Sequence, residues 1–213
     1  MTSMVSPAVR LVYVVPTNAE EVIAQARWLC KNNQKDEPTR AQIERSIENA
    51  LTTGHVSVLE HASASFEIDL SRVSSHQLVR HRMASYVQES QRSVAQPNEV
   101  ILPQAFTDLA PDDLEGVLGF LNHAHNLYKQ LQDHGMRRED ARYILPQAFT
   151  TLLRMTANFR TWMHFLRLRL HPAAQGEIKS IAQTIQILLE EACPAVFSMR
   201  SLVLYTEVPE WSE

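Results

Sequence analysis

Cysteine and glycine are both rare in this sequence. The chain has only 2 cysteines and 5 glycines among its 213 residues. Cys30 and Cys193 are far apart and belong to no Cys-x-x-Cys pair, so neither a disulfide framework nor a zinc knuckle is expected, and we expect two buried, inert thiols. With little glycine and no low-complexity segment, the composition is that of a folded chain rather than a disordered one.

Long hydrophobic runs are missing as well. No stretch approaches the roughly 20 apolar residues that cross a bilayer, and the N-terminus lacks a basic region followed by an apolar run. These absences predict a soluble, cytoplasmic protein with no membrane partner. The length of 213 residues allows a sizeable core, and we expect a single domain over residues 1–213.

Lysine is the third rare residue. The chain has 20 basic residues, and only Lys31, Lys35, Lys129 and Lys179 are lysines, so the others are arginines. The formal net charge of -4 argues against a general nucleic-acid-binding protein, which normally carries a basic excess. Arginine presents a planar fork of donors that suits phosphates and flat heterocycles. Clustered arginines on an acidic chain therefore favour small anionic ligands.

Hydrophobic periodicity predicts an α+β fold with a mainly antiparallel sheet flanked by helices. The clearest strand covers residues 62–70, where Ala, Phe, Ile and Leu alternate with Ser, Glu and Asp. Further strands are expected at 9–15 and 151–158, and an edge strand at 201–208. Helices are expected at about 18–33, 39–53, 74–82, 111–134, 137–144, 160–170 and 175–192. The sequence contains no Gly-x-Gly-x-x-Gly segment, so a Rossmann dinucleotide site is not expected.

The histidines do not form a recognisable metal site. In residues 54–61, two histidines and Glu60 match neither His-Glu-x-x-His nor its inverse, and no third ligand lies at a suitable interval. His123 and His125, two residues apart on a long helix, face different directions and are expected in solvent. We therefore predict no bound metal.

The densest group of anion-binding side chains lies in residues 80–92. Arg80-His81-Arg82 stand at the end of an expected helix that Ser74 or Ser75 caps. Successive helical residues point about 100° apart, so these three side chains serve different parts of a large ligand or different chains. Beyond the helix, Ser90-Gln91-Arg92 suit a phosphate. A second arginine group, in residues 160–170, by itself favours an amphipathic helix with a solvated basic edge.

One heptapeptide occurs twice. Ile-Leu-Pro-Gln-Ala-Phe-Thr stands at 101–107 and again at 144–150. The flanking residues do not match, whereas solenoid repeats duplicate a whole supersecondary unit. The pattern therefore predicts no repeat architecture, and it indicates no function.

Four short blocks together resemble the flavin-dependent thymidylate synthases. They are Gly54-His55 through Glu60-His61, Gln77 through Arg92, Ala141-Arg142 with Leu145-Pro146, and Asn158-x-Arg160 followed by His164-Phe165-Leu166 and Leu168-Arg169. They occur in the order that the family shows, and they cover most of the chain. Four ordered blocks are far more specific than the arginine-rich signature by itself.

The resemblance implies an enzyme that converts dUMP to dTMP by reductive methylation. It implies methylene-tetrahydrofolate as the carbon donor, FAD reduced by NADPH as the hydride source, and a homotetramer whose sites are shared between subunits. Family positions that touch FAD correspond to Ser57, Arg80, His81, Arg82, Gln88, Asn158, Arg160 and His164. Positions that touch dUMP correspond to Gln77, Arg80, Gln88, Ser90, Gln91, Arg92, Arg142 (from another chain) and Arg169, which meets the uracil ring.

Arg169 and Ser90 are the catalytic residues that the resemblance implies. A guanidinium against the uracil edge would stabilise a developing N3 anion and raise electron density towards C5. Ser90 has no obvious base near it in sequence, so we expect it to bind and orient dUMP rather than to bond to C6. The setting of Cys193 does not match the nucleophile of the non-flavin thymidylate synthases, and we expect it to be structural.

Three positions depart from the family pattern. Gln88 stands where many members carry Glu, His164 where Asn is frequent, and Ser93 where Tyr usually follows the arginine. A glutamine keeps an acceptor and adds donors but loses the charge. The departures concern details of FAD and phosphate contacts rather than the fold.

Three other hypotheses compete with the enzyme. The first is a binding module that keeps the nucleotide pocket and lacks turnover. The second is a nucleic-acid-binding protein, whose affinity for polynucleotide would depend steeply on salt. The third is a histidine-based metal hydrolase, which would hold stoichiometric zinc. The complete set Arg80, Ser90, Arg92 and Arg169 favours the enzyme over the first. The negative net charge disfavours the second, and the histidine spacing disfavours the third.

Overall fold

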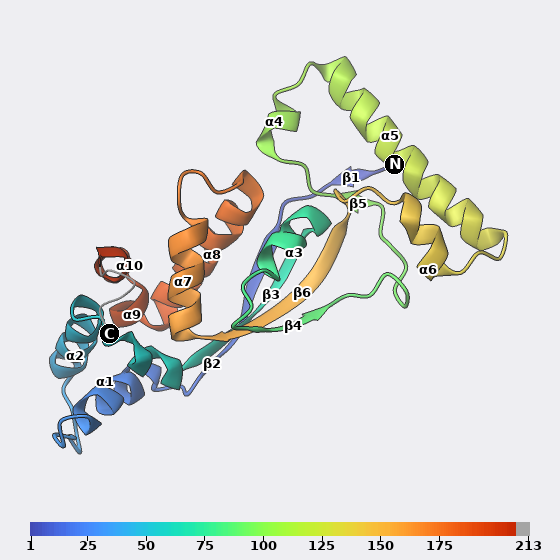
Figure 1. The fold of residues 1–213 in the computed structure, drawn as a ribbon. Helices are drawn as coiled ribbons and strands as arrows, with labels where there is room; N and C mark the ends of the chain where they lie inside the picture. The colour runs from blue at the N-terminus through green and yellow to red at the C-terminus, as the bar shows by residue number, and fades with distance from the viewer. Residues whose placement is uncertain (208–213) are drawn as a thin grey trace.

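The computed structural model describes residues 1–207, which form an elongated molecule around a long antiparallel sheet (Figure 1). Along the chain the elements are β1 (Ser3–Met4), β2 (Ala8–Val15), α1 (Ala19–Leu29), α2 (Arg40–Thr52), the 3-10 helix η1 (Val56–His61), β3 (Ser63–Ser71), α3 (Arg72–Leu78), β4 (Ser85–Gln88), β5 (Glu99–Val100), α4 (Gln104–Thr107), α5 (Pro111–Asp133), α6 (Arg138–Ala141), the 3-10 helix η2 (Arg142–Ile144), β6 (Thr150–Asn158), α7 (Phe159–Arg169), α8 (Gly176–Ala192), α9 (Pro194–Phe197) and α10 (Met199–Glu207). The α+β class is confirmed.

The main sheet has the strand order β2-β3-β6-β4, and each neighbouring pair is antiparallel. β3 and β6 pair along their whole length, from Ser63 opposite Asn158 to Ser71 opposite Thr150. At about 3.3 Å per residue, a strand of this length spans roughly 27 Å. The small β1-β5 pair is parallel, so the sheet structure is mainly, but not wholly, antiparallel as expected.

One face of the sheet carries the core. The alternation in β3 places Ala64, Phe66, Ile68 and Leu70 on the buried side, each with an exposed fraction of 0%. Helices α7 and α8 cover this face (Figure 1). Trp162 of α7 packs edge-to-face on Phe66 at 5.0 Å between ring centroids, and its indole N–H donates to the Ala64 carbonyl at 3.1 Å.

The opposite face of the sheet is polar at its centre. Glu67 of β3 pairs with Arg10 of β2 and with Arg154 of β6, the residues that lie beside it in register. The hydrogen bonds and charges of Arg154 and Arg10 lower the pKa of the Glu67 carboxyl. Leu152 of β6 and Val87 of β4 are exposed on the same face, Val87 to 73%. This surface therefore combines an ion cluster with accessible apolar side chains.

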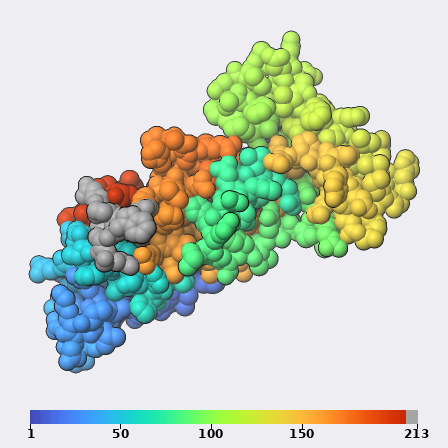
Figure 2. All heavy atoms as spheres, in the orientation of Figure 1, coloured from blue at the N-terminus to red at the C-terminus, as the bar shows by residue number. Residues whose placement is uncertain are grey.

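A second, smaller core lies at the far end of the sheet, under α5. Its buried residues are Val100, Leu121 and Phe149. The two copies of the heptapeptide meet there: Val100, just before the first copy, bridges to Phe149, and the Ile101 N–H donates to the Ala148 carbonyl at 3.0 Å. The first copy ends in α4, whereas only the last residue of the second copy, Thr150, belongs to a strand, β6. In Figure 2 this region stands out as a lobe at one end of the molecule.

Helix α3 differs from the expectation at both ends. Its N-cap is Ser71, whose hydroxyl accepts from the Ser74 N–H at 3.1 Å, while Ser74 and Ser75 lie inside the helix. The helix ends at Leu78, so Arg80-His81-Arg82 follow it rather than belong to it. Strand β4 was not predicted at all.

Three further expectations, about the C-terminal segment and about the burial of two side chains, were wrong. Residues 201–207 belong to helix α10 rather than to an edge strand, and Val208 lies outside the described residues. His125 is buried, not solvated, with an exposed fraction of 1%. Cys30 is exposed, whereas Cys193 is buried as expected, and burial raises the pKa of its thiol to about 12.

The start of α3 depends on a carboxylate from a distant helix. Glu177, in the first turn of α8, is 7% exposed and accepts from both the N–H and the hydroxyl of Ser71, at 2.7 and 2.6 Å. Glu177→Ala leaves two buried donors without an acceptor, so we expect it to lower the free energy of unfolding by about 3 kcal/mol. Urea denaturation measures the loss, with the exposed Glu191→Ala of the same helix as a control. Equal stabilities of the two variants would contradict the role of Glu177.

None of the helices within residues 1–207 has an apolar stretch long enough to cross a bilayer.

Candidate functional site

The turn after α3 separates its three basic side chains. Two sets of hydrogen bonds hold the turn. The His81 N–H donates to the Leu78 carbonyl at 3.1 Å. The Tyr86 hydroxyl lies within hydrogen-bond distance of both the Leu78 and the His81 carbonyls, at 2.9 and 2.8 Å. Burial raises the pKa of Tyr86 to about 12, which keeps its hydroxyl a donor. Arg80 and Arg82 are exposed, whereas His81 is buried. The divergence expected for these residues is confirmed, although a turn and not a helix produces it.

Arg169, the last residue of α7, reaches the same turn. Its Nε–H donates to His81 Nε2 at 3.0 Å, and its second terminal nitrogen donates to the Gln77 carbonyl at 3.2 Å. Burial lowers the pKa of the guanidinium. A half-buried arginine with two fixed hydrogen bonds has a defined orientation, so this is no solvated basic edge.

Gln88 lies at the end of β4 with its side chain turned towards α3. Its amide nitrogen donates to Ser75 Oγ at 3.1 Å and to Thr151 Oγ1 at 3.3 Å. A glutamate could only accept from these hydroxyls, so the departure from the family pattern changes the direction of both bonds. Gln88 therefore also joins α3 to the sheet.

The residues expected at the phosphate lie in the loop that follows β4. Ser90 forms a tight turn, since its carbonyl accepts from the Ser93 and Val94 N–H groups at 2.9 Å and its hydroxyl accepts from the Arg92 N–H at 3.3 Å. Arg92 pairs with Glu139 of α6 at 3.0 Å, and Arg137 contacts the same carboxylate. Arg142 donates to the Glu139 carbonyl at 3.2 Å. Two arginines thus contact the Glu139 carboxylate, and a third contacts the backbone carbonyl of the same residue.

Buried polar groups beneath this loop fix its course. The Gln91 amide donates to the Gln96 side-chain oxygen at 2.7 Å, and the Gln96 amide donates to the Thr150 carbonyl at 3.0 Å. His125 of α5 contacts the Gln96 carbonyl at 2.9 Å. Burial lowers the pKa of His125, so the neutral ring is favoured. The histidine expected in solvent thus supports the loop that follows β4.

Arg72, in the first turn of α3, was missed by the sequence reasoning. It lines a small cavity together with Glu89, Gln91, Val94, Ala95, Gln96, Pro97 and Thr151. Its buried Nε has no hydrogen-bond partner among residues 1–207. Burial, and to a lesser extent repulsion from Arg142, lowers the pKa of the Arg72 guanidinium. A lone arginine at the start of a helix carries no sequence signal for such a position.

Several residues expected at FAD lie at the opposite end of β6. The side chain of Asn158 caps α7 by accepting from the Thr161 N–H at 2.9 Å. Arg160 pairs with Glu60 of η1 at 2.8 Å, which ties α7 to the segment that carries the exposed Ser57. His164 Nδ1 lies 3.3 Å from the Arg167 guanidinium.

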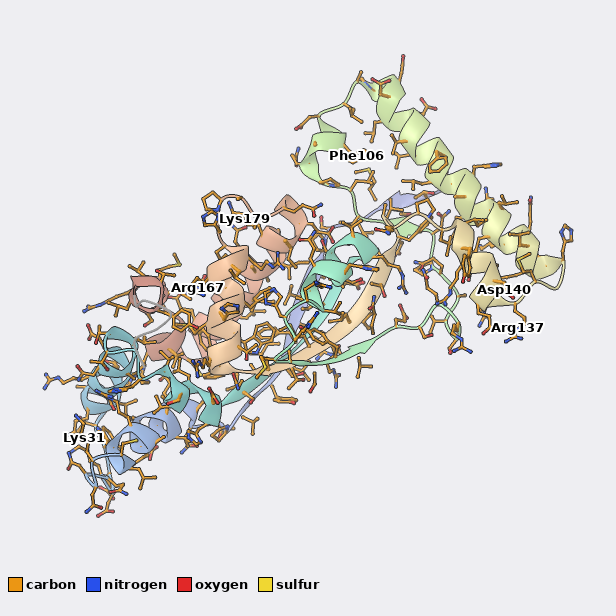
Figure 3. All side chains as sticks on the ribbon, in the orientation of Figure 1. Lys31, Phe106, Arg137, Asp140, Arg167 and Lys179 are labelled. Atoms are coloured by element: carbon orange, nitrogen blue, oxygen red, sulfur yellow. The ribbon has the colours of Figure 1, made fainter. Side chains whose placement is uncertain are left out.

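One chain does not bring all of these residues together. Arg142 precedes β6 and Asn158 ends it, and a strand of nine residues spans roughly 27 Å. Figure 3 places Arg137 beside α6 and Arg167 on α7, well apart along the molecule. A single chain therefore presents the loop after β4 and the Asn158–Arg160 region as separate surfaces.

Within residues 1–207, no three histidine, cysteine or carboxylate side chains cluster in a way that could hold a metal ion.

Comparison with known proteins identifies the family. The family model described as thymidylate synthase complementing protein, Thy1, matches residues 10–195. A flavin-dependent thymidylate synthase from Sulfolobus acidocaldarius is 35% identical over 186 residues, which are 84% of this chain and 72% of the relative. The chain belongs to the flavin-dependent thymidylate synthase family. The resemblance seen in the four sequence blocks is thereby confirmed.

Other members of the flavin-dependent thymidylate synthase family give similar values. The enzyme of Geobacter sulfurreducens is 36% identical over 189 residues, 84% of this chain and 80% of the relative. That of Thermococcus kodakarensis is 42% identical over 146 residues, 66% of this chain, and this match spans only 59% of the relative's length. The fold agrees as well: the structure of the UMP/dUMP methylase PolB from Streptomyces cacaoi, bound with 5-Br dUMP, superposes with a TM-score of 0.82 at 24% identity, over 96% of this chain and 97% of that one.

Proposed function

We propose that this chain converts dUMP to dTMP by reductive methylation, with methylene-tetrahydrofolate as carbon donor and with FAD, reduced by NADPH, as hydride source. Membership of the flavin-dependent thymidylate synthase family supports the reaction. The assignment of residues rests on the position of Arg169. Its guanidinium is held beside the turn Arg80-His81-Arg82, called here the arginine turn, by hydrogen bonds to His81 and to the Gln77 carbonyl. A fixed, partly buried guanidinium is the group that this reaction needs at the pyrimidine.

Arg169 acts on the uracil edge. Two of its donors are used inside the protein, and the remaining N–H groups of the fork are left for a ligand. Hydrogen bonds to O2 and to the N3 side of uracil stabilise negative charge as it develops at N3, which raises electron density at C5. Because the site is partly buried, each of these bonds is stronger than it would be in water.

The loop after β4 binds the phosphate. Ser90 and Arg92, with Arg142, supply charge-assisted hydrogen bonds to a dianion. Arg72 adds a further guanidinium beside Gln91, and its unpartnered Nε gives it a free donor. In this arrangement Ser90 orients dUMP and forms no bond to C6, because among residues 1–207 its hydroxyl contacts only the Arg92 N–H and no base that could take its proton.

The residues around the arginine turn fit a flavin nucleotide. Arg80 and Arg82 are exposed, and within residues 1–207 neither side chain has an ion pair or hydrogen bond, so both guanidinium groups are free for a pyrophosphate. Ser57, Gln88, Asn158, Arg160 and His164 complete the proposed contacts. FAD supplies the hydride when it is bound. The chain's own part is to hold the isoalloxazine against the pyrimidine and to exclude water.

A homotetramer with sites shared between subunits completes the proposal. The loop after β4, assigned to dUMP, and the Asn158–Arg160 region, assigned to FAD, lie at opposite ends of β6 in one chain, so contact between the two ligands requires part of each site to come from a second chain. The outer sheet face, with exposed Val87 and Leu152 around the Glu67 ion cluster, offers apolar surface for association. Light scattering on the purified protein measures the assembly. The cytoplasmic location stays a prediction.

The Glu139 carboxylate competes with a bound phosphate for the same arginines. Its carboxylate contacts both Arg92 and Arg137, so a bound phosphate must displace it or lie beside it. Glu139→Gln removes one negative charge, and we expect it to tighten binding of dUMP about 10-fold while leaving binding of deoxyuridine, which has no phosphate, unchanged. Calorimetric titrations with both ligands measure the effect. Weaker binding of dUMP in the variant would mean that Glu139 serves to orient Arg92.

A labelled turnover assay tests the proposed function. The protein is incubated without oxygen with dUMP, NADPH, FAD and methylene-tetrahydrofolate deuterated at its methylene carbon, and products are resolved by mass spectrometry. The proposal predicts dTMP that carries the label, and none when dUMP, the folate or the reductant is left out. Binding of dUMP without dTMP formation would instead support a module that has kept the pocket without turnover.

A further inference from the structure

His81 is the buried member of the arginine turn. Its exposed fraction is 7%, whereas Arg80 and Arg82 on either side are exposed. The imidazole packs edge-to-face on Phe165 of α7, with 5.0 Å between ring centroids, and lies 6.4 Å from the His164 ring. The backbone of the turn is fixed separately by the Tyr86 hydroxyl at the His81 carbonyl, at 2.8 Å. The ring therefore faces α7 rather than solvent.

The hydrogen bond to Arg169 defines the protonation state of this ring. A guanidinium has only donors, so His81 Nε2 must offer its lone pair to the Arg169 Nε–H at 3.0 Å, and the proton of the neutral ring then resides on Nδ1. The titratable groups facing the ring are Arg169 and His164, both on α7. Burial, Arg169 and His164 together lower the pKa of His81 to about 4, so the ring is neutral and the bond is intact above that pH.

We infer that His81 is a positioning residue, which acts on the substrate through Arg169 rather than as a contact to the flavin. The inference rests on the proposed function, in which Arg169 meets the uracil ring. The Gln77 carbonyl holds one end of the guanidinium, and His81 Nε2 fixes its Nε edge. With both points in place, the plane of the guanidinium is set before dUMP arrives. Without His81, Arg169 keeps its charge but rotates about the remaining bond.

Two substitutions separate this role from cofactor binding. His81→Phe keeps an aromatic ring against Phe165 but removes the acceptor, and we expect kcat/KM for dUMP to fall about 100-fold while the FAD content of the purified protein stays unchanged. His81→Gln restores an oxygen acceptor and should limit the loss to about 10-fold. Loss of FAD from both variants would overturn the inference in favour of a flavin contact.

A double-mutant cycle tests whether the effect passes through Arg169. In an Arg169→Ala background there is no guanidinium to orient, so adding His81→Phe should change dUMP affinity and residual activity by less than about 2-fold. If His81→Phe costs as much in that background as in the wild type, the two residues act independently and the inference is wrong.

The tautomer gives a readout that requires no turnover. In protein labelled with 15N-histidine, His81 should show a pyridine-type Nε2 and a protonated Nδ1, and Arg169→Ala should shift the Nε2 resonance. A protonated Nε2, or a resonance indifferent to Arg169→Ala, would overturn the inference even in an active enzyme. An intact tautomer in a protein that forms no dTMP would instead leave the pair standing and contradict the proposed function.

Discussion

Replacement of Arg169 by alanine is expected to reduce dTMP formation by about 10³-fold or more while FAD stays bound. The guanidinium is the group placed to take up charge at N3 of uracil, and alanine leaves nothing that can do so. The proposed FAD contacts lie on other residues, so the flavin spectrum of the variant should match the wild type. Single-turnover assays at saturating dUMP, with absorbance for flavin content, measure both effects.

A matched control separates this loss from a general effect of removing an arginine. Arg200→Ala deletes an exposed arginine that pairs with Glu48 on the surface, and it should leave turnover unchanged. Loss of flavin from Arg169→Ala would show that Arg169 holds the cofactor and that its assignment to the uracil ring is wrong.

Mixing two inactive variants should restore activity. If each site takes Arg142 from one chain and Arg169 from another, a tetramer assembled at random from Arg142→Ala and Arg169→Ala chains has both arginines intact in about a quarter of its sites. Each variant alone has none, because phosphate binding fails in the first and activation of the base fails in the second. Co-expression with two affinity tags, followed by assays on the purified mixed tetramer, gives the fraction recovered.

The double variant provides the control for this experiment. Chains that carry both substitutions, mixed with Arg142→Ala chains, have no site with both arginines and should stay inactive. A mixed tetramer of the two single variants that also stays inactive would place Arg142 and Arg169 in the same chain's site and contradict sharing between subunits.

Local patterns were enough to predict the central strands and several helices. The alternation in β3 gave its buried face, because residues two apart in a strand share a side of the sheet. The Thr39–Gln42 pair forms a capping box at the start of α2, and Gly54, beyond the end of that helix, has a positive φ of 74°. These features depend only on neighbours in sequence.

Elements that depend on distant partners could not be predicted. Ser71 caps α3 while its hydroxyl and N–H both donate to Glu177, more than 100 residues away, so the local sequence did not distinguish it from Ser74 or Ser75. Just before α10, the Ser198 hydroxyl accepts from the Ser201 N–H, and Leu202 within the helix packs into the main core. That packing outweighs the β-strand preference of Leu202-Val203-Leu204-Tyr205.

The repeated heptapeptide shows the same limit most directly. Two identical sequences adopt different structures, one leading into α4 and the other into β6. Their flanks decide, because Phe149 is buried beneath α5 in the second copy, whereas Phe106 of the first is not part of that core. Identical local propensities are therefore overridden by tertiary contacts.

For the site, the sequence predicted a set of residues but not how they are arranged. The four blocks identified the family, yet the Arg169–His81 bond joins positions 88 residues apart, and Arg72 belongs to no recognised pattern. The burial of His125 follows from the course of residues 91–97, which periodicity does not reveal.

The most direct test of the central claim is the visible spectrum of the purified protein under anaerobic NADPH, recorded with and without dUMP. A flavoenzyme whose nucleotide site contacts its cofactor should show a flavin spectrum that bleaches, and bleaching should be faster once dUMP is present. A colourless protein that takes up no added FAD would contradict the account and would leave the arginine cluster as a site for anions alone.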